Sequence, residues 1–149
     1  MGSTEINKNI VSISIVPMEK QRYKTLGDYI IYPNEEIVIK VSNTGINKYN
    51  LLIAVHELIE VLLTEDRGIK EPDIAKFDIK FEKERKDGKH EEWEEPGDSP
   101  DSPYRKEHRF AENIERQLAH ELGINWNEYE NYLLDYLTSY KPPIIVQNK

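Results

Sequence analysis

The chain of 149 residues contains no cysteine, which excludes disulfide bonds and thiolate ligands for a metal. A strongly bound metal would need histidine, aspartate or glutamate as ligands. No apolar run reaches the roughly 20 residues of a membrane-spanning helix. The polar start MGSTEINKN has neither the basic nor the apolar region of a signal peptide. These absences predict a cytoplasmic protein with no membrane partner.

Positive charge is scarce, because 20 lysines and arginines stand against 28 aspartates and glutamates, for a formal net charge of −8. Non-specific binding to nucleic acid needs a basic surface that displaces counterions from phosphates. The charge balance therefore disfavours nucleic acid as a partner. The length fits one domain, residues 1–149, large enough to bury a core without disulfides.

The first third of the chain has the pattern of β-strands. Apolar residues alternate with polar ones in 11–16 and again in 36–41, and Pro33-Asn34 is typical of a hairpin turn between 28–32 and 36–41. We therefore expect a small antiparallel sheet of about three strands within residues 11–41. Packed on three or four helices, this sheet would make an α+β fold.

The remaining chain has the apolar spacing and end signals of helices. Helices are expected at about 48–66, 103–122 and 126–139, with Gly68 and Gly123 as end signals and Asn125 as an N-cap. The segment 72–86 fits a helix or a strand, with the helix favoured. Two further segments complete the chain: an acidic, proline-rich loop at about 87–102 and a flexible tail at 141–149.

The expected first helix carries a polar stripe on an otherwise apolar surface. The stripe within LLIAVHELIEVLLTE, residues 51–65, consists of His56, Glu57, Glu60 and Thr64. At about 100° per residue they fall within an arc of roughly 100°. Ionisable groups are costly to bury unless they are paired, hydrogen-bonded or bound to a metal. The stripe therefore predicts a metal site or an acid–base site.

A second helix repeats the pattern His-x-x-x-Glu. His108 and Glu112 match His56 and Glu60, and Glu115 lies one turn further on. If the two helices pack together, these five side chains converge on one divalent cation. Zinc fits such a set tetrahedrally, while manganese or iron would add water ligands.

Other interpretations of the acids stay open at this stage. Asp78 is expected either to be solvated or to accept a hydrogen bond from a metal-ligating imidazole. Glu60 or Glu115 would alternatively form an ion pair with an arginine of the 103–122 helix. The arginines available for such a pair are Arg105, Arg109 and Arg116.

The string HELIE, from His56 to Glu60, resembles a variant of the HExxH helix of zincin metallopeptidases. The resemblance implies a metal-dependent hydrolase in which His56 is a ligand and Glu57 activates a metal-bound water. Glu112 or Glu115 would stand for the ligand that a later helix supplies in that family. Glu60 departs from the pattern, since it occupies the position of the second histidine, and a carboxylate leaves zinc less Lewis acidic.

A broader resemblance covers roughly residues 20–137. This part of the chain is similar to small proteins encoded by bacteriophages and prophages, which implies a phage origin, a location in the host cytoplasm and no particular reaction. A non-catalytic protein that binds a host factor is therefore an alternative function. In addition, Glu57-x-x-Glu60 and Glu112-x-x-Glu115 resemble the magnesium sites of all-helical nucleotide pyrophosphohydrolases. The sequence leaves the substrate and the oligomeric state open.

Overall fold

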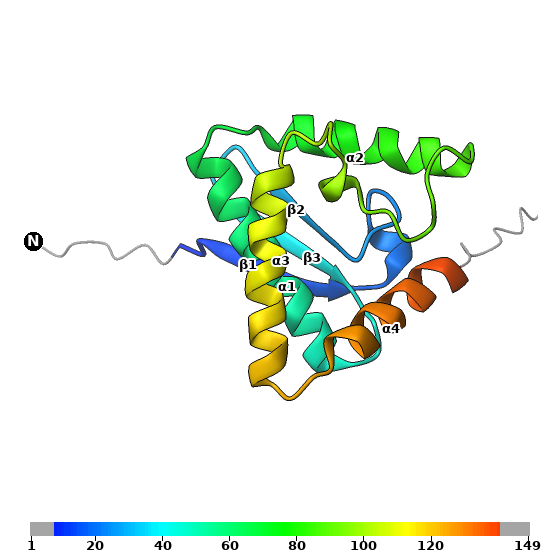
Figure 1. The fold of residues 1–149 in the computed structure, drawn as a ribbon. Coiled ribbons are helices and arrows are strands. Elements are labelled where there is room, and N and C mark those ends of the chain that lie inside the picture. Colours follow the sequence, from blue (N-terminus) through cyan, green and yellow to red (C-terminus); the bar gives the residue numbers. More distant parts are fainter. Residues whose placement is uncertain (1–7, 141–149) are drawn as a thin grey trace, which may run out of the picture.

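The computed structural model describes residues 8–140 as three strands and four α-helices, with two short 3₁₀ turns (Figure 1). The elements are β1 (Val11–Val16), η1 (Met18–Lys20), β2 (Gly27–Ile31), β3 (Ile37–Ser42), α1 (Asn47–Asp66), α2 (Glu71–Lys86), η2 (Pro96–Asp98), α3 (Arg105–Glu121) and α4 (Trp126–Ser139). The α+β class is confirmed. The expected tail, 141–149, lies outside the described residues.

The three strands form a mixed sheet in the order β1-β3-β2. β2 and β3 are an antiparallel hairpin, as predicted, but β1 pairs with β3 in parallel, so the expectation of a wholly antiparallel sheet is wrong. After Val16 the chain crosses through η1 to the other side of β3 before it enters β2. Alternating side chains reveal that a segment is a strand but not the direction in which it pairs, because the period of two is the same in both cases.

The core forms where the central strand meets α1. Ile39 and Val41 of β3 are fully buried, as are Leu52 and Val61 of α1, and the four belong to one apolar cluster. Burying each such side chain stabilises the fold by about 1.5–3 kcal/mol. This packing fixes α1 against the sheet and thereby fixes the direction of its polar stripe.

The ambiguous segment 72–86 is helical, as favoured from the sequence. Pro72 lies in the first turn of α2, where its missing N–H leaves no hydrogen bond unmade. Ile74, Asp78 and Phe81 are buried together on one face, at spacings that match a helix and not a strand. Gly88, with φ of +80°, follows the helix end and accommodates the left-handed turn there.

Two helices from distant parts of the sequence then pack against each other, since α3 lies along α1. α3 begins at Arg105, two residues later than expected, and the backbone N–H of Tyr104 donates to Ser102 just before it. α4 begins as predicted, with the side chain of Asn125 accepting from the Glu128 N–H at 3.0 Å. Within residues 8–140, no helix has the length and apolar character needed to cross a membrane.

Candidate metal site

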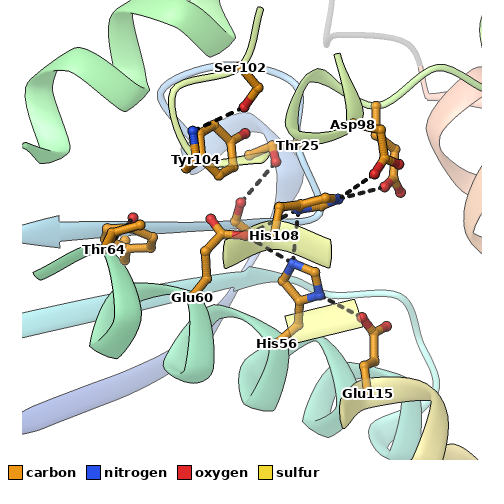
Figure 2. Close-up of polar contacts among 12 residues, drawn as sticks. Thr25, His56, Glu60, Thr64, Asp98, Ser102, Tyr104, His108 and Glu115 are labelled. Carbon is orange, nitrogen blue, oxygen red and sulfur yellow. Dashed lines mark hydrogen bonds and ion pairs between the residues drawn. The ribbon is translucent and has the colours of Figure 1, made fainter. Parts of the chain in front are cut away.

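The packing of α1 on α3 brings His56, Glu60 and His108 together in the interior (Figure 2). All three are buried, with exposed fractions of 9%, 5% and 9%. The two imidazole rings meet edge to face, with centroids 4.9 Å apart. The His-x-x-x-Glu spacing on α1 thus places a nitrogen and an oxygen beside a nitrogen from α3, as the repeated pattern predicted.

The three inward atoms form a nearly equilateral triangle. His56 Nε2 lies 3.1 Å from Glu60 Oε2 and 3.2 Å from His108 Nδ1, and the third edge, from His108 Nδ1 to Glu60 Oε2, is 3.1 Å. Ligands at the bond lengths of tetrahedral zinc are about 3.3 Å from one another. The donor set and its spacing therefore fit three corners of a zinc tetrahedron, with the fourth corner left for water or substrate.

Glu115 does not belong to this triangle, contrary to its expected role as a ligand. Its Oε1 accepts a hydrogen bond from His56 Nδ1 at 2.7 Å, on the far side of the ring, and its Oε2 accepts one from the Tyr129 hydroxyl. Glu115 lies about one turn beyond Glu112 on α3, and this position places the Glu115 carboxylate behind the His56 ring. There it orients the ring, so that Nε2 is the nitrogen directed at the triangle.

Glu112 also lies outside the triangle. Its carboxylate belongs to a second group, with Glu95, Asp98 and the outer nitrogen of His108, in which the potential ligand atoms lie within 4.8 Å of one another. Partial burial and the negative charge of Glu95 raise the pKa of Glu112 to about 7. The structure therefore does not bring all five side chains around one position: Glu112 and Glu115 lie outside the triangle, since a helix cannot aim three successive turns at one point beside its flank.

Glu57 is buried beside the triangle without a partner. It is 9% exposed and lines a cavity of about 510 Å³, and its carboxylate makes no hydrogen bond within residues 8–140. Burial, and next the negative charge of Glu60, raise its pKa well above the ordinary value. A buried, unpaired carboxylate beside potential metal ligands is arranged to accept a proton.

Opposite charges hold the triangle together. Burial raises the pKa of Glu60, but hydrogen bonds from His108 and His56 outweigh burial and lower that pKa to about 2. Burial lowers the pKa of His108, whereas its hydrogen bonds to Glu60 and Glu95 raise it to about 10. Burial likewise lowers the pKa of His56, but its hydrogen bonds to Glu115 and Glu60 outweigh burial and raise that pKa well above the ordinary value. A divalent cation would compete with protons for the inner nitrogens of both rings.

Asp78 contacts no imidazole, so its expected role beside a ligating histidine is not observed. It accepts hydrogen bonds from the hydroxyl groups of Tyr23, at 2.9 Å, and Tyr104, at 2.6 Å. Burial raises its pKa to about 7. Asp78 faces the site from α2 but is bound by two tyrosines that stand between it and the triangle.

The ion-pair alternative for the acids of α1 and α3 does not match the contacts. In the described part of the chain Glu60 bonds to the two imidazoles and Glu115 to His56 and Tyr129, and neither pairs with an arginine. The magnesium alternative requires Glu57, Glu60, Glu112 and Glu115 around one cation. Glu115, however, lies behind His56, and the chain is not all-helical.

Two contributors to the site lie in the loop that the sequence analysis left without a role. Glu95 Oε2 accepts from His108 Nε2 at 3.0 Å, and Asp98 Oδ1 lies 3.8 Å from the same nitrogen. The length of the loop was the one indication in the sequence that it contributes to a site, since long connections inside a small domain are often functional. Loops have no helical or strand period, so nothing in the sequence indicated which of their acids turn inward.

Comparison with protein-family models, curated proteins and solved structures finds no match to this chain. The resemblances to zincins and to phage proteins therefore stay predictions.

Proposed function

We propose that this chain is a metal-dependent hydrolase, with zinc held by His56, Glu60 and His108. The observation that carries the proposal is the triangle of two imidazole nitrogens and one carboxylate oxygen with edges of 3.1–3.2 Å. A structural zinc site is closed by four protein ligands, whereas a catalytic one has three and keeps one position open. The three-ligand set therefore favours catalysis.

Glu57 supplies the base that hydrolysis needs. Zinc, when bound, lowers the pKa of a coordinated water towards neutrality. Glu57 follows His56 directly on α1, faces the cavity and has a raised pKa, so its carboxylate is free to take the proton of an attacking water and return it to the leaving group. The substrate would occupy the cavity of about 510 Å³, which is large enough for a small molecule or a few residues of a peptide.

The test begins with the metal. Protein purified without added metal should contain about one zinc, manganese or iron per chain, and chelation followed by addition of zinc should lower and then restore the melting temperature. Absence of metal, together with no response to added zinc or manganese, would contradict the proposal.

The substitution Glu57→Gln then tests whether Glu57 acts in catalysis or only in the structure of the site. The metal-loaded protein is assayed against a panel of ester, amide, peptide and nucleotide substrates, and any turnover found should fall at least about 100-fold in Glu57→Gln while the metal content stays unchanged. A matched control is Glu92→Gln, which removes a charge from the cavity rim at a more exposed position. Equal turnover in Glu57→Gln and the wild type would exclude Glu57 as the base.

A non-catalytic protein that binds a host partner is the alternative, with the metal acting as a structural link between α1 and α3. The two functions differ at Glu57, because a structural site has no use for a buried carboxylate that has no partner. If Glu57 has no catalytic role, replacing it with glutamine removes a buried ionisable group that has no partner and raises the free energy of unfolding. That gain, with no activity on the panel, would support the alternative.

A further inference from the structure

The loop between α2 and α3 encloses the outer side of His108. Three of its residues make this contact: Glu95 and Asp98 through their carboxylates and Gly97 through its backbone. In Figure 2 the dashed lines from His108 run inward to the other ring and Glu60 and outward to the loop. Each nitrogen of the ring thus has a separate set of acceptors.

Gly97 presses on the ring itself. A Cβ atom at this position would lie 2.4 Å from Cγ and 2.6 Å from Nδ1 of His108, closer than any side chain allows. Gly97 is buried within η2, which packs on both α2 and α3. Only glycine fits this close approach, and the contact prevents the ring from turning towards the loop.

The loop is held in place from both sides. The guanidinium of Arg85, on α2, donates to the backbone carbonyls of Glu91 and Glu94, immediately before Glu95. Arg105, at the start of α3, donates from Nε to the Asp98 carbonyl at 3.2 Å. A loop anchored in this way has the geometry of a fixed support and not of a mobile lid.

An imidazole can bind a metal through either nitrogen, and the nitrogen that carries the proton is set by the partner of the other one. Glu95 Oε2, 3.0 Å from Nε2, holds a proton on that nitrogen, so Nδ1, which faces Glu60 and His56, is the nitrogen left to exchange its proton for a metal. We propose that Glu95, Gly97 and Asp98 are positioning residues, which fix the tautomer and orientation of His108 for metal binding. This inference rests on the proposed metal site.

Glu115 gives the same support to His56, since it accepts from Nδ1 at 2.7 Å and leaves Nε2 inward. The two rings are therefore oriented by two carboxylates from different elements, Glu115 from helix α3 and Glu95 from the loop. Loss of such an outer partner typically lowers metal affinity by about 10–100-fold. The loop thus has a defined role, since its acids act on the metal site through His108.

The test measures Co²⁺ affinity by absorbance and Zn²⁺ affinity by competition, for the wild-type chain and for Glu95→Ala/Asp98→Ala. The variant should bind each metal about 10–100-fold more weakly. Glu92→Ala is the matched control, because it removes a carboxylate of the same loop that makes no hydrogen bond within residues 8–140. Its affinity should equal that of the wild type.

Imidazole ¹⁵N resonances of the zinc-loaded protein give a readout that loss of stability alone would not change. In the wild type His108 should bind through Nδ1 and show a slowly exchanging proton on Nε2. In Glu95→Ala/Asp98→Ala that proton should exchange rapidly, and part of the population should bind through Nε2. Gly97→Ala should weaken metal binding while both carboxylates remain, and if it does not fold, the double variant decides.

The outcomes separate the two proposals. If the wild-type chain binds no metal, the proposed function and this inference both fail. If the wild type binds metal and the Glu95→Ala/Asp98→Ala variant matches it in affinity and in Nδ1 coordination, the metal site stands and the positioning role is wrong.

Discussion

At the scale of single residues, His56 and His108 have the same arrangement. One nitrogen of each ring faces the triangle, and the other faces a carboxylate. The helical period placed His56, Glu57, Glu60 and His108 correctly from sequence, because side chains on a regular helix have fixed angular positions. The helical period alone could not distinguish the residues that face the triangle from those that orient an imidazole ring. Glu115 and Glu60 both lie beside His56, and only the packing of α3 shows which nitrogen each one faces.

Glu60 and Glu112 were both expected to bind the metal, and the structure separates them. Glu60→Gln should lower zinc affinity by more than the roughly 10–100-fold that is typical of an outer partner, because it removes the anionic corner of the triangle. Glu112→Gln should change the affinity by less than about threefold if zinc binds only in the triangle. Competition with a chromogenic chelator measures both, and equal losses in the two variants would contradict this assignment.

Asp78 gives a pH dependence that can be isolated from the metal site. Burial raises its pKa from 3.8 to about 7, so the folded state holds the proton more tightly than the unfolded state. Its contribution to stability is complete below about pH 4 and is lost as the pH rises through 7. Asp78→Asn cannot ionise, so between pH 5 and 8 the variant should gain on the order of 2–3 kcal/mol relative to the wild type.

Urea denaturation of both proteins in chelator, at pH 5 and at pH 8, measures this difference. Comparing variant with wild type at each pH cancels the other ionisable groups, since the contacts of Glu60 and the histidines are common to both proteins. A stability difference that is the same at the two pH values would show that Asp78 does not titrate between them and would contradict the prediction.

At the scale of elements, the sequence predicted which segments are helices and strands better than how they meet. The β2–β3 hairpin follows from a local turn, so it was predictable, while the parallel pairing of β1 depends on a crossover that no local signal encodes. The contact of α1 with α3 joins residues about 50 positions apart. It was inferred from the repeated His-x-x-x-Glu pattern, because two buried polar stripes must face each other or a common ligand.

The contact between β2 and α1 also sets the position of Glu57, the proposed base. A Cβ atom on Gly27 would lie 2.7 Å from Glu57 Oε1 and 2.8 Å from its Cγ, so the strand approaches α1 closely only because residue 27 is glycine. Gly27→Ala should destabilise the protein by about 1–3 kcal/mol through overpacking. In a Glu57→Ala background the obstruction is gone, and the same substitution should cost less than about 0.5 kcal/mol.

Chemical denaturation of the wild type, both single variants and the double variant completes this cycle. A cost of Gly27→Ala that is equal in the two backgrounds would show that the strand, and not Glu57, resists the added methyl group. With a substrate in hand, Gly27→Ala should also lower turnover and leave the metal content unchanged, since the displaced group, Glu57, is the proposed base and not one of the proposed ligands.

At the scale of the whole molecule, side chains from α1, α3 and the loop between α2 and α3 meet around one position, the proposed metal site. A cation that binds only the folded chain stabilises it by about 2.7 kcal/mol when its concentration is 100 times its Kd. For a chain of this size, each kcal/mol raises Tm by about 2–4 °C. Saturating zinc should therefore raise the Tm of the chelator-treated protein by about 5–10 °C.

Differential scanning calorimetry across a zinc titration checks this shift, with Glu60→Gln as the control that should show little of it. The unfolded chain offers only four histidines and no cysteine, so zinc binding to that state offsets little of the stabilisation. A shift of equal size in the wild type and in Glu60→Gln would place the ion elsewhere on this acidic chain. A shift confined to the wild type would mean that the cation binds at Glu60, whose carboxylate lies 3.1 Å from an imidazole nitrogen of each helix.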